Sequence, residues 1–399
     1  MSESEPDRTL PQQADAHRLE MIGLLRTHLA GILADAQTVW EPSAHAPGLA
    51  GQLARRLGSS RTLVAFRGHL TMDPGEGYRL LRQRFETIGY TPTLHREGEW
   101  EVVTALPAVF GQSRPRRPWV NLLLFALTFL TTTFMGALLE QSELLVERGL
   151  TLFLEQPWRL LSGIPTALTI MGILGLHELA HYFTARKNKL DSSLPYFIPV
   201  PFGFGTFGAI IRMRTPWENR NALFDVGVAG PIAGILVALP LFFLGLLSAE
   251  AMPPMPEGMP LGTPLLLRWM EDIVYLVRGI PEQYELYISA WAFAAWFGIV
   301  VSGFNLMPIG QLDGGHVAYA LFGKYTRYLS IAVLIAIAVM AFLLWGGWFA
   351  WLAFTFLSGW LHPPPLNMLE PLSKGRVLLG IGVLILTALI FTPVPFPVL

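Results

Sequence analysis

The residues most able to do chemistry in this sequence are His177, Glu178 and His181, which lie in the string His177-Glu178-Leu179-Ala180-His181. Two histidines four residues apart lie on one face of an α-helix, so their ring nitrogens can converge on a single Zn²⁺. Glu178 then lies beside them as a base that can take a proton from water. The pattern predicts a helix that carries two metal ligands and a catalytic carboxylate.

This string lies inside an apolar run, at about 160–183, that is long enough to cross a bilayer. A charged residue inside a membrane costs about 3 kcal/mol on insertion scales, so ionisable residues there usually face a protein interior or a polar cavity. Several such groups in one helical turn need a compensating partner. A metal ion is the partner that fits best, and a purely structural role is the alternative.

The composition is that of a membrane protein. Of the 399 residues, 52% are hydrophobic and only 14% are charged, which is unlike an ordinary soluble enzyme. A formal net charge of −1 gives no sign of nucleic-acid binding. Because the chain has no cysteine, its zinc ligands must come from His, Asp or Glu.

A third ligand is expected from the segment 305–316, where Pro308, Gly310 and two further glycines interrupt an apolar run. Irregular backbone is tolerated at membrane depth only where it faces protein or a cavity. Asp313 is the preferred third ligand, because the glycines that follow it permit close approach of the backbone. His316 is the alternative, either as a ligand itself or as a neighbour of the site.

Two regions of different composition define the predicted domains. Residues 1–117 read as a small soluble α+β domain, and residues 118–399 as a membrane-embedded domain whose core covers about 158–322. The predicted fold class is therefore mainly α, a polytopic helical membrane protein with about seven spans. These spans are expected at 119–139, 160–183, 223–247, 286–307, 328–345, 348–361 and 377–392.

Local patterns predict the elements of the amino-terminal domain. Apolar residues at helical spacing favour a helix over 19–39, and Asp73 is a suitable N-cap for a helix that ends near Glu86. A strand is expected over 61–70. Two further strands, 91–94 and 100–104, are predicted to form a hairpin around Gly98.

The distribution of charge predicts the orientation in the membrane. The basic linker at 114–117 precedes the first span, and basic residues near the spans gather on the same side, which the positive-inside rule makes cytoplasmic. The acidic start of the chain lacks the features of a signal peptide. The expected location is therefore a bacterial cytoplasmic membrane, with a cytoplasmic amino terminus and an external carboxyl terminus.

Three further features concern packing around the histidines. The apolar segment 194–211 is broken by prolines and glycines, so we expect a re-entrant hairpin whose free backbone can pair with an extended substrate, or a structural flap. Gly230 and Gly234 allow another helix to approach closely. Asp225 is expected to pair with an arginine rather than to act as a cap or a proton route.

Two well-separated motifs carry a family resemblance. His177-Glu178-Leu179-Ala180-His181, together with Asn305, Pro308, Leu312, Asp313, Gly314 and Gly315, resembles the paired motifs of site-2 proteases, the intramembrane metalloproteases. The amino-terminal domain and His362-Pro363-Pro364-Pro365 are similar to the bacterial and plastid branch named for gravitropism-deficient, yellow-green plants.

The resemblance implies roles for single residues. It implies zinc ligation by His177, His181 and Asp313, and Glu178 as the catalytic base. Asn305 matches a motif asparagine, for which we suggest stabilisation of the oxyanion or orientation of the substrate. The substrate-adjacent strand of the family is matched by Gly205, Thr206, Phe207 and Gly208.

The expected activity is hydrolysis of peptide bonds within or near the transmembrane segments of other proteins, with such a protein and the lipid bilayer as partners. This would make the chain a zinc-dependent endopeptidase of regulated intramembrane proteolysis. The alternatives are an ion transporter or channel, and a catalytically inactive membrane scaffold. Transporters tend to show internal repeats, which are not evident here, and the intact Glu178 argues against an inactive relative.

Overall fold

A computed structural model describes residues 9–41, 63–110, 117–254 and 260–397. The acidic start of the chain and the linker residues 114–116, on which part of the predicted orientation rests, lie outside these ranges. The chain divides into two compact units, of which the first contains 1–112, 215–220 and 363–371. The second unit contains 113–214, 221–362 and 372–399.

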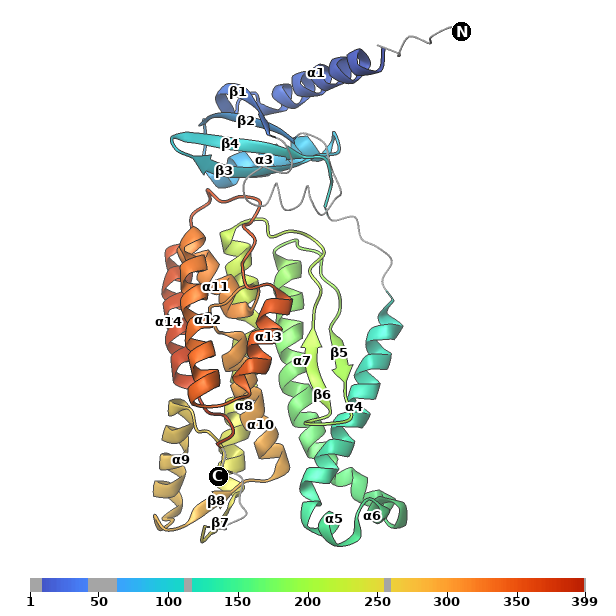
Figure 1. The fold of residues 1–399 in the computed structure, drawn as a ribbon, viewed down its shortest axis with the longest axis vertical. Helices are drawn as coiled ribbons and strands as arrows, with labels where there is room; N and C mark the ends of the chain where they lie inside the picture. The colour runs from blue at the N-terminus through green and yellow to red at the C-terminus, as the bar shows by residue number, and fades with distance from the viewer. Residues whose placement is uncertain (1–8, 42–62, 111–116, 255–259, 398–399) are drawn as a thin grey trace. The chain divides into compact units, whose positions relative to one another are not determined.

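In its described residues, the first unit is an antiparallel sheet with two helices (Figure 1). Its strand order is β1-β2-β4-β3, and every neighbouring pair is antiparallel. The predicted small α+β domain is therefore observed. Its elements are α1 (Thr9–Leu29), β1 (Leu33–Glu41), β2 (Leu63–Leu70), α3 (Pro74–Glu86), β3 (Thr91–Glu97) and β4 (Trp100–Leu106).

Local sequence explains most of these elements. The Asp73 side chain accepts hydrogen bonds from the backbone of Gly75 at 2.9 Å and of Glu76 at 3.2 Å, so it caps α3 as predicted. The β3–β4 hairpin turns through Gly98, whose φ of 60° favours glycine. The predicted helix over 19–39 is wrong in its second half, because α1 ends at Leu29 and the following residues pair with β2.

Two segments from far along the chain complete this unit. The Leu94 amide donates to the carbonyl of Leu366 at 2.7 Å, and the Met368 amide donates to that of Leu94 at 2.9 Å. The Leu366 amide in turn donates to the carbonyl of Trp217 at 2.8 Å. Since Leu366 is only 1% exposed and belongs to the core cluster, the unit includes residues well beyond the predicted boundary at 117.

The second unit is helical (Figure 1). Its longer helices are α4 (Pro118–Glu140), α7 (Ile164–Lys187), α8 (Arg220–Ser248), α9 (Leu265–Arg278), α10 (Ala290–Asn305), α11 (Asp313–Phe322), α12 (Thr326–Leu343), α13 (Trp348–Ser358) and α14 (Lys374–Ile390). Shorter elements are α5 (Ser142–Arg148), α6 (Thr151–Glu155), the 3₁₀ helices η1 (Pro157–Gly163) and η2 (Gly323–Tyr325), and the paired strands β5 (Tyr196–Pro199) with β6 (Thr206–Ile210) and β7 (Glu250–Met252) with β8 (Glu285–Tyr287).

Within the described ranges, four helical stretches are long and apolar enough to cross a membrane, so the chain is a multi-pass membrane protein. These stretches are Pro118–Glu140, Pro157–Lys187, Arg220–Ser248 and Asp313–Leu343. The predicted count of about seven is not confirmed, since α10, α13 and α14 are too short. A helix of 16 residues such as α10 is about 24 Å long, whereas the hydrocarbon core of a bilayer is about 30 Å thick.

The packing expectations for α8 hold. A Cβ at Gly230 would meet the imidazole of His181, and a Cβ at Gly234 would meet the side chain of His177. Both glycines therefore let α8 approach the histidines closely. Asp225 of α8 forms a bidentate ion pair with Arg376 of α14, at 2.6 and 2.7 Å. The predicted pairing of Asp225 with an arginine is confirmed.

Candidate metal centre

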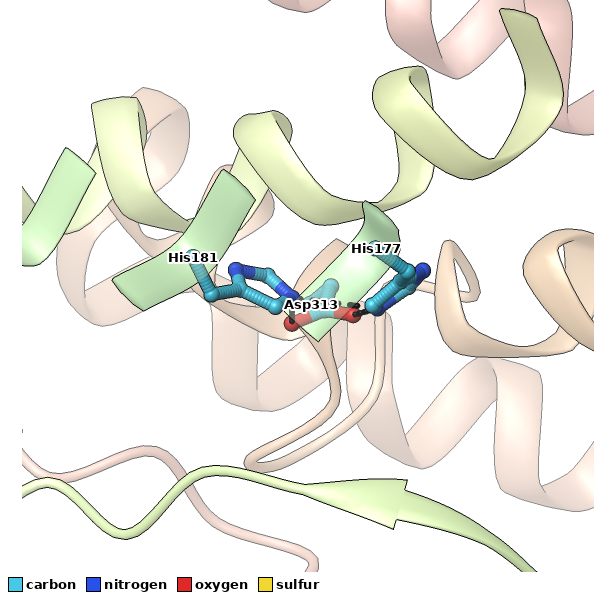
Figure 2. Close-up of side chains that lie close together, drawn as sticks. All are labelled: His177, His181 and Asp313. Carbon is cyan, nitrogen blue, oxygen red and sulfur yellow. Dashed lines mark hydrogen bonds and ion pairs between the residues drawn. The ribbon is translucent and has the colours of Figure 1, made fainter. Parts of the chain in front are cut away.

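Three side chains from two distant parts of the sequence meet inside the second unit (Figure 2). His177 and His181 project from one face of α7, and Asp313 is the first residue of α11. The Asp313 carboxylate lies 3.3 Å from Nε2 of His177 through Oδ2 and 3.3 Å from Nε2 of His181 through Oδ1. The candidate ligand atoms all lie within 4.8 Å of one another.

The orientation of His181 is fixed by α8. Its Nδ1 lies 2.8 Å from the carbonyl oxygen of Val226, which can only accept a hydrogen bond, so Nδ1 carries the proton. In the neutral ring Nε2 then holds a lone pair, which is directed toward Asp313 and toward Nε2 of His177 at 3.1 Å. A backbone carbonyl that orients a ligating histidine in this way is typical of metal sites.

The break between α10 and α11 brings Asp313 to this position. The chain turns through 306–312 and restarts as a helix at Asp313, as the prolines and glycines predicted. Gly314 and Gly315 pack directly on the backbone of this turn, where a Cβ at either position would overlap the carbonyl oxygen of Leu306 or of Gly310. The glycines are therefore needed for α11 to begin so close to the turn.

The donor set fits a metal such as zinc. His177 and His181 are 4% and 5% exposed, and the Asp313 side chain is 17% exposed. Two imidazole nitrogens and a carboxylate converge there with no Lys or Arg among the ion pairs described for them. A cation at the point of convergence would balance the carboxylate and bind both Nε2 atoms, and two imidazoles with a carboxylate form an accepted set of ligands for catalytic zinc.

Glu178 lies beside the three candidate ligands. It is 8% exposed, and its Oε1 is 4.0 Å from Nε2 of His177. The backbone amide of Ile211, which directly follows β6, interacts with its carboxylate. A carboxylate in this position can reach a water molecule held near the three ligand atoms, as a catalytic base must.

His316, the alternative third ligand, points elsewhere. Its Nδ1 lies 2.7 Å from Nε2 of His362, and the His362 ring stacks on Tyr319. Sequence reasoning did not assign a partner to His362, although the string His362-Pro363-Pro364-Pro365 that begins with it was noticed. The structure thus joins His316 to His362, both of them half-buried, and leaves Asp313 with the histidines of α7.

The predicted substrate segment spans the turn into β6. Thr206 is 8% exposed and Phe207 is 68% exposed, while Gly205 and Gly208 have φ values of 81° and 95°. β5 packs along α4 and β6 lies beside α7 (Figure 1). The predicted hairpin is therefore present next to the helix that carries the histidines.

Asn305 is the last residue of α10 and is half-buried. Among the described contacts, no hydrogen bond joins its amide to the three candidate ligands or to Glu178. The structure thus brings His177, Glu178, His181 and Asp313 together, and places Asn305 at the start of the turn that leads to Asp313.

Comparison with known proteins finds a family whose sequence model resembles this core. Residues 165–346 match the sequence model of Peptidase family M50, to which site-2 proteases belong, so the predicted resemblance is confirmed. The matched range contains both histidines and Asp313.

Several curated relatives are plant proteins. The chain is 27% identical over 347 residues to the probable zinc metalloprotease EGY2, chloroplastic, of Oryza sativa subsp. indica, covering 84% of this chain and 62% of the relative. It is 30% identical to EGY2 of Arabidopsis thaliana, covering 59% of this chain and 42% of that relative. It is 32% identical to EGY1 of Oryza sativa subsp. japonica, covering 41% and 29%. The chain thus spans less than two thirds of each of these relatives.

Proposed function

We propose, on the premise that residues 165–346 belong to peptidase family M50, that this chain is a zinc-dependent intramembrane protease of the site-2 type. Its reaction would be hydrolysis of peptide bonds within or near the transmembrane segments of other membrane proteins. The observation that carries the proposal is the convergence of His177, His181 and Asp313 between helices long and apolar enough to cross a bilayer. Such an arrangement serves hydrolysis where water is scarce.

His177, His181 and Asp313 would hold the zinc, leaving a position for water. When bound, zinc supplies a Lewis acid that favours ionisation of water and polarises a peptide carbonyl. Glu178 would take the proton from the attacking water and pass it to the leaving amine. Its place, 4.0 Å from the Nε2 of a ligand, supports this role.

The substrate must be locally unwound, because an α-helix hides its carbonyls in hydrogen bonds. Residues 205–208 and the adjoining strand β6 would hold the unwound segment extended by strand addition. The exposed ring of Phe207 supports this assignment, since it offers an apolar contact to a side chain of the substrate. For Asn305 we propose contact with the substrate carbonyl or its oxyanion, reached from the turn that carries Asp313.

The membrane topology follows the charge distribution. We propose seven spans, in which α10, α13 and α14 cross with the help of adjoining turns, and a division into an amino-terminal domain, 1–117, and a membrane domain, 118–399. Basic residues near the spans concentrate on the side of the amino terminus, whereas the other side carries Arg148, Arg159, Arg268 and Arg278. A cytoplasmic amino terminus in a bacterial membrane stays a proposal, because the named relatives are chloroplastic.

The test is cleavage of a single-span substrate by the purified full chain in lipid nanodiscs. Wild-type protein should cleave it, and Glu178→Gln should reduce kcat by about 10²–10⁴-fold while zinc content stays unchanged. Glu282→Gln, at an exposed glutamate after α9, is the matched control and should retain full activity. Retention of zinc without cleavage by any variant would favour a transporter or a scaffold, and equal cleavage by Glu178→Gln would remove Glu178 as the base.

A further inference from the structure

We propose that α4 positions the β5–β6 hairpin, and through it both an extended substrate and Glu178, by means of Asn121 and Thr131. The inference rests on the proposed function and adds positioning residues to it. Asn121 and Thr131 are polar residues in a mostly apolar span. Polar side chains in spans are costly and usually have a specific partner, which here is the backbone of the hairpin.

Asn121 holds the beginning of the hairpin. Its Nδ2 donates to the carbonyl oxygens of Leu194 at 3.1 Å and of Pro195 at 2.8 Å, directly before β5. In a membrane an unsatisfied backbone carbonyl is unfavourable, because no water is present to hydrogen-bond it. One side chain amide therefore satisfies two carbonyls and ties this end of the hairpin to α4.

Thr131 holds the other end. Its Oγ1 lies 2.7 Å from the carbonyl oxygen of Gly205, closer than to either carbonyl of its own helix. Gly205 packs on the α4 backbone so closely that a Cβ there would overlap Thr131 and Thr132. Its φ of 81° also favours glycine, so two independent observations indicate that this residue serves the junction with α4.

The spacing of the two anchors matches the hairpin. Asn121 and Thr131 are ten residues apart, which is about 15 Å along a helix. The strand from Pro195 to Val200 rises about 17 Å. Between the anchors Phe125 of α4 makes an edge contact with Phe197 of β5, with ring centroids 5.2 Å apart. The strand is thus attached to α4 along its whole length.

The hairpin passes this positioning on to the catalytic base. β5 pairs with β6 in an antiparallel ladder, in which Tyr196 lies opposite Ile210. The next residue, Ile211, interacts through its backbone with the Glu178 carboxylate. A shift of the hairpin relative to α4 would therefore move both the strand that receives the substrate and a hydrogen-bonding partner of Glu178.

The experiment compares Thr131→Val, Thr131→Ser and Asn121→Leu in the full chain, with Thr132→Val as the matched control. Thr132 is buried in the same helix, but its hydroxyl donates only within α4, to Thr128 at 2.8 Å or Phe129 at 3.0 Å. The readouts are kcat and KM for the single-span substrate, the cleavage site by mass spectrometry, zinc content and thermal unfolding.

Thr131→Val and Asn121→Leu should each lower kcat about tenfold, as loss of about 1.4 kcal/mol predicts. They should also produce additional cleavage sites, with zinc content unchanged. Thr131→Ser should restore wild-type behaviour, because it keeps the hydroxyl, and Thr132→Val should match wild type. Wild-type rates and a single cleavage site in Thr131→Val would overturn the inference. The comparison of Thr131→Val with Thr132→Val tests the inference even where Asn121→Leu fails to fold. Lack of cleavage by wild-type protein would instead overturn the proposed function.

Discussion

Gly230→Ala tests the metal centre without changing any ligand. Gly230 lies in α8 against the imidazole of His181, and all three atoms nearest to a Cβ built at this position belong to that ring, with Nε2 the nearest. The Cβ would lie closer to Nε2 of His181 than real Cβ atoms approach other heavy atoms, whereas ordinary contact begins at 3.4 Å. His181 is 5% exposed and is held by Val226, so the ring cannot turn away freely.

The expected effect is a large loss of zinc affinity. The ring would have to retreat by about 1 Å, several times the tolerance of roughly 0.2 Å on metal–ligand distances. Changes to groups that orient a ligand typically reduce metal affinity by about 10–100-fold, and displacement of the ligand itself should cost at least as much. Zinc affinity would be measured by competition with a chromogenic chelator, and zinc content by mass spectrometry.

Gly234→Ala is the control, one helical turn further along α8. There a Cβ would lie 3.4 Å from Nδ1 of His177 and from Oγ of Ser302, which is ordinary contact. Both substitutions favour a helix by about 0.5–1 kcal/mol, so helix propensity cannot explain a difference between them. Zinc binding by Gly230→Ala as tight as that of Gly234→Ala and wild type would refute the assignment of His181 as a ligand.

Three further predictions concern stability. Burial, followed by the charge of Asp272, raises the pKa of Glu271 to about 7, so the folded chain keeps a proton that the unfolded chain loses near pH 4.5. The stability contributed by this proton is complete below pH 4.5 and is lost as pH rises through 7. Between these pH values the thermal midpoint of Glu271→Gln should therefore fall less than that of wild type. Asn367 is fully buried; its amide oxygen accepts from the backbone of Leu369 at 3.1 Å and Glu370 at 3.4 Å, and its Nδ2 donates to the Pro74 carbonyl at 3.3 Å and the Glu370 carboxylate at 3.5 Å. Chemical unfolding should show that Asn367→Ala costs about 1–3 kcal/mol, and that Asn367→Asp costs at least as much because it places a second carboxylate against Glu370; a smaller loss for Asn367→Asp would contradict this account. Chelation of zinc should lower the thermal midpoint, because free zinc at about 100 times its dissociation constant stabilises by about 2.7 kcal/mol; His177→Ala should show no response to the chelator, and an unchanged response in that variant would argue against the site.

The amino-terminal domain shows where local sequence suffices and where it fails. Asp73 caps α3 and Gly98 forms the turn of a hairpin, because both features depend only on neighbouring residues. The strand β1 was missed, since the apolar spacing around it also suits a helix and its pairing with β2 spans about thirty residues. Leu366 could not be assigned to this core from its own neighbourhood, which is a proline-rich turn between two apolar helices.

In the membrane domain, too, local sequence predicts some features and not others. The spacing of His177 and His181, the glycines after Asp313 and the lack of cysteine predicted two ligands and the helix break and left Asp313 and His316 as candidates for the third ligand, since these features depend on residue type and local backbone freedom. Asn121 in an apolar span is a signal that sequence reasoning could have used, but its partners could not be named.

Residue types and helical period were thus enough to name His177, His181 and Glu178 as candidates, because one turn of a helix fixes their geometry, whereas Asp313 was named from the helix break that precedes it. Only the tertiary structure decided that Val226 orients His181, that His316 pairs with His362, and that α4 holds the hairpin. These contacts join residues more than forty positions apart, and the packing of whole helices, rather than any local pattern, determines which side chains meet.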